Sequence, residues 1–144
     1  MILLYGRKKS GLPFPANKRR LSRIFEFIFI FARKYEIETF DIYKKVSSIS
    51  QKTNQKYYEV FYNFIEAKNN DGKCPYNNAT YSSELCEKLL KIYAKKNNIV
   101  YDPFIGTGTT AVACKRMGFN CIGSEISEKQ VEYAKDRLSK MEVE

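Results

Sequence analysis

The 144-residue sequence has no histidine, and none of its four prolines stands next to another. Without histidine, sites that pair a serine or cysteine nucleophile with histidine are excluded. The cysteines also lack the CxxC spacing of structural zinc sites, and no histidine is present to complete a ligand set. We therefore expect no metal site and reduced, mostly buried thiols. The four cysteines are Cys74, Cys86, Cys114 and Cys121.

Long apolar runs are missing as well. The longest, Ile24 to Ala32, contains Glu26 and is far shorter than the roughly 20 residues that span a bilayer. The apolar N-terminus, Met1 to Tyr5, lacks the basic, apolar and small-residue order of a secretory signal. We therefore expect a cytoplasmic protein with no membrane partner.

The composition, 44% hydrophobic and 28% charged, is that of a globular domain with a core. The net charge of +9 is unevenly placed, because seven basic residues and no acidic one lie between Arg7 and Arg23. This segment has the charge to neutralise DNA phosphates, but a merely solvated basic loop has the same composition. The seven residues are Arg7, Lys8, Lys9, Lys18, Arg19, Arg20 and Arg23.

In the first half, the run of Phe and Ile over 24–31 predicts a central strand covered on both faces. The apolar spacing over 54–68 predicts a helix with an aromatic stripe, and the polar segment 69–78 predicts a loop.

In the second half, helical and strand patterns alternate, which favours a parallel sheet with crossover helices. Gly118 can end the second helix in a left-handed cap, and Ser127 to Gln130 form a capping-box pattern at the start of the last. The expected elements are helices over 82–96, 109–117 and 127–141 and strands over 99–102 and 120–123.

A glycine-bearing turn follows the strand at 99–102. It reads Gly106-x-Gly108-x-x-Ala111, and Glu125 lies nineteen positions after Gly106. Glycines allow a ligand to approach the backbone closely, and an acid at the tip of the next strand can accept hydrogen bonds from ribose hydroxyls. The layout therefore indicates an adenosine-containing ligand, although a plain tight turn gives the same glycine spacing. Asp102-Pro103-Phe104 before the glycines disfavours a nicotinamide dinucleotide.

The segment DPFIGTGTT, Asp102 to Thr110, resembles the DPFxGSGTT signature of DNA methyltransferases that act on adenine-N6 or cytosine-N4 amino groups. The resemblance implies a partial Rossmann-like α/β fold, mostly parallel, with S-adenosylmethionine as cofactor and double-stranded DNA as substrate, as in restriction-modification enzymes. It makes Glu125 the ribose-binding acid. Ala134, Arg137 and Leu138 are similar to the AxxRL pattern of the family's closing helix.

The segment Ala79 to Leu85 is similar to the family's HPAxFPxxL segment, which lies beside the methionine end of the donor. Its histidine and prolines are replaced here, so a capped helix start explains the segment equally well. The resemblance implies a cofactor site formed by Thr80, Tyr81, Ser82, Asp102, Pro103, Phe104, Gly106, Gly108, Thr109, Thr110, Glu125 and Ile126.

The order of segments resembles the circularly permuted subgroup, in which the donor pocket is C-terminal. It implies a basic loop and post-catalytic strand over 1–34, an insertion and recognition region over 35–78, and a donor-binding subdomain over 79–144. The chain would then be the C-terminal portion of the pattern.

The family's catalytic tetrapeptide, an Asp, Asn or Ser followed by Pro-Pro and an aromatic, is absent, so no catalytic residue is assigned. Cys74-Pro75-Tyr76 is the nearest approximation and has one proline. We expect either one subunit of a split enzyme, with a second methyltransferase subunit carrying the tetrapeptide, or the product of an interrupted gene. The alternatives are an inactive remnant or binding module of the same fold and, third, a small-molecule methyltransferase or nicotinamide enzyme.

Overall fold

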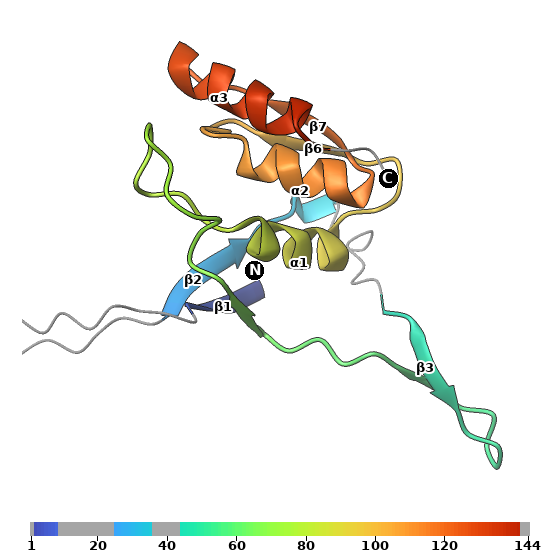
Figure 1. The fold of residues 1–144 in the computed structure, drawn as a ribbon. Helices are drawn as coiled ribbons and strands as arrows, with labels where there is room; N and C mark the ends of the chain where they lie inside the picture. Colours follow the sequence, from blue (N-terminus) through green and yellow to red (C-terminus); the bar gives the residue numbers. More distant parts are fainter. Residues whose placement is uncertain (1, 9–24, 36–43, 142–144) are drawn as a thin grey trace, which may run out of the picture.

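The computed structural model describes residues 2–8, 25–35 and 44–141, so most of the basic segment between Arg7 and Arg23 lies outside the described residues. Helices and strands alternate in the C-terminal half (Figure 1). The elements are β1 (Ile2–Lys8), β2 (Phe25–Ile30), β3 (Val46–Ile49), β4 (Lys56–Tyr58), β5 (Phe64–Ala67), α1 (Ser83–Tyr93), β6 (Ile99–Asp102), α2 (Thr109–Met117), β7 (Asn120–Gly123) and α3 (Glu128–Ser139).

The strands of the described residues form three small sheets. One has the order β2-β1-β5, with β1 antiparallel to β2 and parallel to β5. In another, β6 pairs in parallel with β7, from Ile99 opposite Asn120 to Asp102 opposite Gly123, and α2 is the crossover between them. The third is the β3–β4 hairpin. The predicted α/β class with parallel strands and crossover helices is thus confirmed, with β2 and the hairpin adding antiparallel pairs.

The helix predicted over 54–68 is wrong. The segment instead contributes β4 and β5, and β5 buries Ile65 and Ala67 on alternate positions while Phe64 is 36% exposed. Aromatic and β-branched residues suit a pleated strand, and the pairing of β5 with β1 fixes that choice over the helical spacing. The loop predicted over 69–78 is confirmed.

The central strand predicted over 24–31 is an edge strand among the described residues. β2 pairs with β1 alone there, and Phe27 and Phe29 are 61% and 52% exposed. Among its described side chains, the alternate residues Ile28 and Ile30 pack against the core. β2 is apolar on both faces, and this chain therefore covers one of them and leaves the other exposed.

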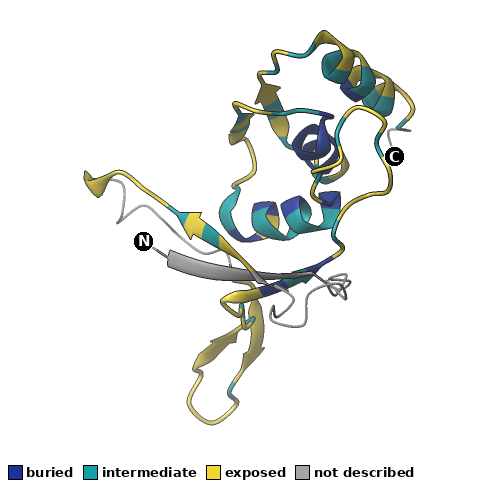
Figure 2. Cartoon of the chain, turned by 90° about the vertical axis from the view of Figure 1, so that its left-hand side faces the viewer, coloured by how far each residue is buried: buried dark blue, intermediate teal, exposed yellow. Residues whose placement is uncertain are grey.

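The core lies on two sides of α1, which appears between α2 and the sheet of β5 (Figure 2). Cys86 and Leu90 pack with Ala113 and Cys114 of α2, whereas Ile92 packs with Ile65. One face of α1 therefore packs against β5 and the opposite face packs against α2. The helix begins after its N-cap Ser82 and ends at Tyr93 rather than Lys96.

β6, α2 and β7 match their predicted bounds, including the left-handed cap at Gly118, whereas α3 spans Glu128–Ser139 rather than the predicted 127–141. All four cysteines carry free thiols; Cys86 and Cys114 are buried and the other two are half-buried.

Candidate functional site

The turn between β6 and α2 depends on glycine at two positions. Gly106 and Gly108 have φ values of 54° and 81°, a region that other residues rarely adopt. A Cβ added to Gly108 would lie 2.8 Å from the Cβ of Ala134 on α3. The two glycines therefore let the turn form and let α3 pack directly on it.

Glu125 follows β7 and connects it to this turn. Its Oε2 accepts a hydrogen bond from the backbone N–H of Gly106 at 3.0 Å, and its Oε1 accepts one from Ser127 at 2.9 Å. An ionised carboxylate offers about four acceptor positions, so the side chain retains capacity for two further donors. Two apolar side chains beside these residues in the sequence, Ile126 and Phe104, are 99% and 85% exposed.

A second polar cluster forms where β6 ends. The Tyr81 hydroxyl lies 2.5 Å from Thr110 Oγ1 and 3.4 Å from Asp102 Oδ2, and Thr110 donates to the same carboxylate oxygen. Burial of the hydroxyl, reinforced by the Asp102 charge, raises the pKa of Tyr81 to about 12, although the residue as a whole is 42% exposed. The cluster brings the segment before α1 against the glycine turn.

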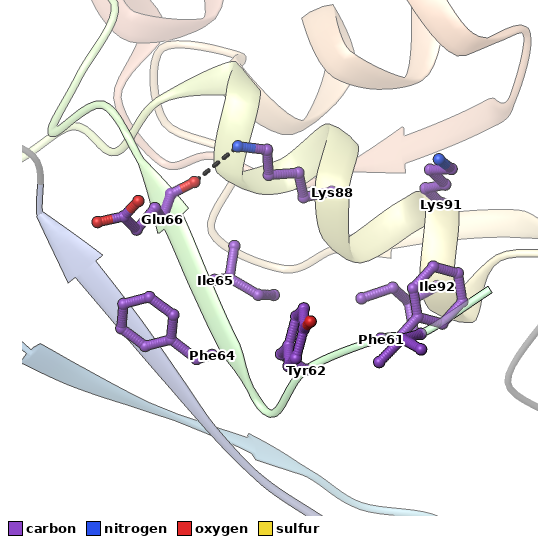
Figure 3. A pocket seen from close by; sticks show the side chains of 9 residues that line it. Phe61, Tyr62, Phe64, Ile65, Glu66, Lys88, Lys91 and Ile92 are labelled. Atoms are coloured by element: carbon purple, nitrogen blue, oxygen red, sulfur yellow. Dashed lines mark hydrogen bonds between the residues drawn. The ribbon is translucent and has the colours of Figure 1, made fainter.

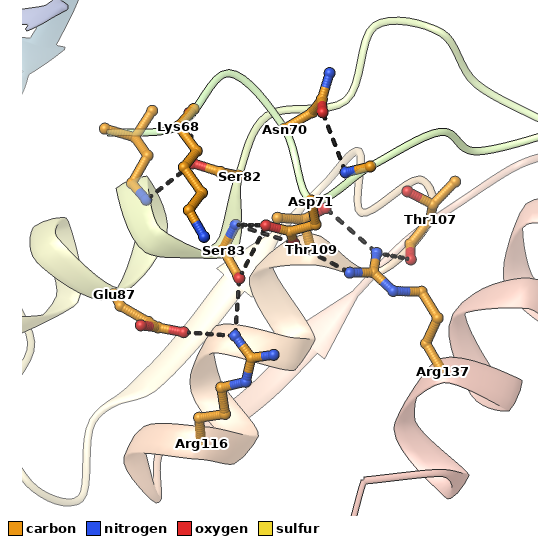
Figure 4. Close-up of polar contacts among 12 residues, drawn as sticks. Lys68, Asn70, Asp71, Ser82, Ser83, Glu87, Thr107, Thr109, Arg116 and Arg137 are labelled. Carbon is orange, nitrogen blue, oxygen red and sulfur yellow. Dashed lines mark hydrogen bonds and ion pairs between the residues drawn. The ribbon is translucent and has the colours of Figure 1, made fainter. Parts of the chain in front are cut away.

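Asp71 and Arg137 are the partners that the sequence did not reveal as a pair. Arg137 donates to the carbonyl oxygen of Thr107 at 2.9 Å and to Asp71 Oδ2 at 3.2 Å (Figure 4). The Asp71 carboxylate also accepts hydrogen bonds from the backbone N–H and the hydroxyl of Ser83. One loop carboxylate thus connects the start of α1, the glycine turn and α3. No periodicity links two residues so far apart in the sequence.

The loop over 69–78 also runs along one face of α3. Tyr76 makes an edge contact with Tyr133, with ring centroids 5.7 Å apart, and Asn77 Nδ2 donates to Gln130 Oε1 at 3.3 Å. That amide pair covers Gly106, because Gln130 Oε1 lies 3.4 Å from where a Cβ of this glycine would stand. The predicted capping box is wrong: Ser127 makes no side-chain cap bond, and Gln130 binds Asn77 instead.

The predicted site residues fall into five groups. Ser82 is fully buried and caps α1, donating its hydroxyl to the carbonyl oxygen of Lys68. Thr80, Tyr81 and Thr109 line a cavity of about 60 Å³ that also touches Asp71 and Arg137. Asp102 and Thr110 form the cluster with Tyr81. Gly106 and Gly108 form the turn, and Glu125 accepts a hydrogen bond from Gly106. Pro103, Phe104 and Ile126 are exposed.

The small cavity sets a size limit. At roughly 10–15 Å³ for each water centre it holds a few water molecules or one small polar group. A nucleoside would have to lie outside it, along the exposed rim near Phe104 and Ile126. A larger hollow of about 350 Å³, between β5 and α1, shares no residue with the predicted site (Figure 3). There Lys88 donates to the carbonyl oxygen of Glu66.

The described residues hold no group of three His, Cys, Asp or Glu side chains placed to bind a metal. None of the helices in the described ranges is long and apolar enough to cross a membrane.

The site combines a glycine turn, an acid after β7 and a parallel β–α–β unit. Sequence comparison identifies the protein family that has this combination. Residues 3–136 match the family of N6/N4 methyltransferases described as DNA methylase. The chain belongs to this family.

Relatives and solved structures agree with that assignment. Type II methyltransferase M2.LlaDCHI of Lactococcus lactis subsp. cremoris is 36% identical over 69 residues, which is 48% of this chain and 24% of that protein. Type II methyltransferase M.HinfI of Haemophilus influenzae is 38% identical over 71 residues, 49% of this chain and 20% of that protein. The chain therefore matches about a quarter or less of these relatives.

Among solved structures, the complex of M1.HpyAVI with SAM aligns with 94% of this chain and 58% of its own, at a TM-score of 0.58 and 27% identity. The cytosine-N4-specific PvuII DNA methyltransferase shares the fold at a TM-score of 0.70 and 18% identity, over 97% of this chain and 52% of its own. The fold seen here thus corresponds to little more than half of each of these two structures.

Proposed function

We propose that this chain is the S-adenosylmethionine-binding part of a restriction-modification type DNA methyltransferase that acts on adenine-N6 or cytosine-N4. The observation that carries the proposal is the Glu125 carboxylate, which is fixed by Gly106 and Ser127 at the ends of adjacent parallel strands. In α/β sheets this edge, where the strands end, is where nucleoside ligands bind. We place the donor-binding subdomain at residues 79–144.

The site residues fit the donor at three points. The free acceptor positions of Glu125 suit two ribose hydroxyls, and the exposed side chains of Ile126 and Phe104 suit the faces of an adenine ring. The small polar cavity at Thr80 and Thr109 suits the charged methionine end. When bound, the donor supplies a sulfonium-linked methyl group for direct transfer to an amine.

The tie between Tyr81, Asp102 and Thr110 gives this chain a positioning role of its own. Because the cluster joins the residues before α1 to the end of β6, it fixes the distance between the two segments that would hold the ends of the donor. Because the sequence lacks the Pro-Pro tetrapeptide, we propose that this chain binds and orients the donor and that it does not itself hold the acceptor base. An extruded base would have to be held by another segment.

We place that segment at an apolar groove of about 430 Å³ beside β6, and we assign it to a second methyltransferase subunit. The groove is floored by Leu89 and Tyr93 of α1 and walled by Phe31 and Ile99, which are 77% and 63% exposed. Among the described strands, β6 pairs with β7 alone. A strand added parallel to β6 would end beside Asp102, close to the donor.

The extent of the structural matches supports an additional segment at this groove. The two solved methyltransferases align with nearly all of this chain but extend well beyond it, with 58% and 52% of their lengths covered. Apolar strand residues left exposed here are the ones that additional strands would cover. Such a complex would act on double-stranded DNA in the cytoplasm.

The decisive experiment incubates labelled S-adenosylmethionine and duplex DNA with the chain alone and with a methyltransferase polypeptide that carries the Pro-Pro tetrapeptide. We expect incorporation only by the pair. Incorporation by the chain alone would overturn the division of labour. A pair that binds both donor and DNA without turnover would instead identify an inactive remnant.

A charge placed in the groove tests the docking site. Ile99→Lys should abolish co-purification with the second subunit, because a lysine would be buried at the strand edge. Val60→Lys is the control, since Val60 is also an exposed apolar residue, 68% accessible, but lies outside the groove. Equal co-purification of both variants would contradict the assignment.

A further inference from the structure

The β3–β4 hairpin stands apart from the rest of the molecule. Every residue from Lys44 to Tyr58 is exposed except Ser50, which is half-buried. The hairpin extends away from the helices in Figure 1, and Figure 2 shows it exposed along its length. A two-stranded hairpin without a hydrophobic face against a core adds little stability. Its presence therefore calls for a role at the surface.

The turn of this hairpin is held in one conformation. The carbonyl oxygen of Ser50 accepts a hydrogen bond from Asn54 N–H, and the N–H of Ser50 donates to the carbonyl oxygen of Gln55, both at 2.9 Å. The hydroxyl of Ser50 accepts a third bond, from Thr53 N–H at 3.3 Å. Asn54 has a φ of 56°, in the left-handed region that asparagine tolerates. The side chains of the turn are thus presented on a preorganised backbone.

The side chains of the hairpin are suited to bind nucleic acid. Between Lys44 and Tyr58 there are four lysines and no acidic residue. Amides of Gln and Asn can bind the N6 and N7 atoms of adenine with two hydrogen bonds, and lysine can bind the acceptors of guanine. Each turn side chain carries a donor; they are Gln51, Lys52, Thr53, Asn54 and Gln55.

The dimensions agree with one groove of DNA. Paired strands lie about 4.8 Å apart, and the major groove, about 12 Å wide, admits a two-stranded ribbon. The minor groove is about half as wide. The exposed apolar side chains of the hairpin, Val46, Ile49, Tyr57 and Tyr58, lie on its strands, and the turn between Ser50 and Lys56 contains only polar side chains, which suit base edges better than a protein surface.

We propose that the β3–β4 hairpin enters the major groove of the substrate DNA and reads base edges with the side chains of its turn. The proposal rests on the proposed function, because it takes duplex DNA as the substrate. It assigns target recognition to residues 51–55, separate from the donor site around Glu125. The lysines of the strands would then contact the flanking phosphates.

The charge contribution is tested with the full chain and a fluorescein-labelled 20-base-pair duplex of mixed sequence, by anisotropy at several salt concentrations. Lys56→Gln should reduce the slope of log affinity against log salt by about 0.9, because the variant neutralises one phosphate fewer. Lys135→Gln, at a lysine of α3 that is also exposed, should leave the slope unchanged. Equal slopes for both variants would overturn the placement of DNA at the hairpin.

Base reading is tested by selection from a randomised duplex pool. Asn54→Gly keeps the left-handed backbone but removes the amide, so it should relax one selected base pair by about 5- to 150-fold while retaining affinity for mixed-sequence duplex. Gln55→Ala should act at a neighbouring position. Unchanged selection by both variants would overturn the reading role. If the unaltered chain binds S-adenosylmethionine but does not bind duplex DNA, the proposal for the hairpin is overturned and the proposed donor site is not.

Discussion

The Tyr81 hydroxyl lies 2.5 Å from Thr110 Oγ1 and thereby joins the residues before α1 to the start of α2. Tyr81→Phe removes this hydrogen bond and leaves Thr110 with Asp102 as its acceptor. We expect a loss of about 0.5–1.5 kcal/mol of unfolding free energy, the usual value for one hydrogen bond, together with weaker donor binding. Tyr62→Phe, at a residue 72% exposed, is the control for chemical denaturation. Equal midpoints for both variants would contradict the structural role of this cluster.

Titration of the same tyrosine makes the stability of the folded chain depend on pH. Its pKa is about 12 in the folded chain, above the ordinary value of 10.0, because burial and the Asp102 charge disfavour the phenolate. The protonated form is therefore favoured by folding. Its contribution to stability is fully present below pH 10 and is lost as the pH rises toward 12. Denaturation midpoints measured across this window should fall less steeply for Tyr81→Phe, and parallel curves would contradict the assignment.

The loss of stability expected from substituting Gly108 has two parts, one from packing and one from backbone strain. Gly108→Ala places a Cβ 2.8 Å from that of Ala134 at a φ of 81°, whereas Gly118→Ala has a similar φ of 72° and nothing within 4 Å. Both should lose about 1–2 kcal/mol to left-handed strain. Gly108→Ala should lose about a further 1–3 kcal/mol from overpacking. Equal melting temperatures would show that α3 does not pack on the turn as described.

The Asp71–Arg137 pair should matter more than an exposed pair. The two side chains are 29% and 21% exposed, and Arg137 also bonds the carbonyl oxygen of Thr107. Arg137→Met should therefore lower the unfolding free energy by about 1.5–3 kcal/mol. Lys140→Met breaks a pair with Asp136 in which the side chains are 72% and 51% exposed, and should change stability by about 0.5 kcal/mol or less. The comparison is made by urea denaturation, and similar losses would refute the ranking.

The thiols should react in a defined order. Burial raises the pKa of Cys114 to about 12 and that of Cys86 to about 11, and both side chains are buried. Because the thiolate is the reactive form, these two should resist a disulfide reagent at pH 8 until the chain unfolds. Cys74, which is half-buried in the loop, should react first. Mass spectrometry of labelled peptides checks the order, and early labelling of Cys114 would contradict the described core.

The C-terminal elements could be predicted because their signals are local. Gly118 ends α2, Asp102 ends β6 and Glu125 follows β7 within a short, regular β–α–β unit. The error over 54–68 arose because aromatic residues at helical spacing also suit a strand, and the choice was fixed by pairing with β1, far away in the sequence. The Asp71–Arg137 pair could not be predicted either, because its two residues also lie far apart in the sequence. The sequence carried no signal for which loop carboxylate would meet α3.

The most direct test of the donor site is calorimetric titration of S-adenosylmethionine into the folded chain, with circular dichroism recorded on the same samples. We predict one binding site per chain, weakened at least about tenfold by Glu125→Gln, which loses a charged acceptor of two hydrogen bonds. Glu128→Gln, at an exposed residue on the first turn of α3, should bind the donor normally. No binding by the folded unaltered chain, or equal affinities for the two variants, would contradict the account.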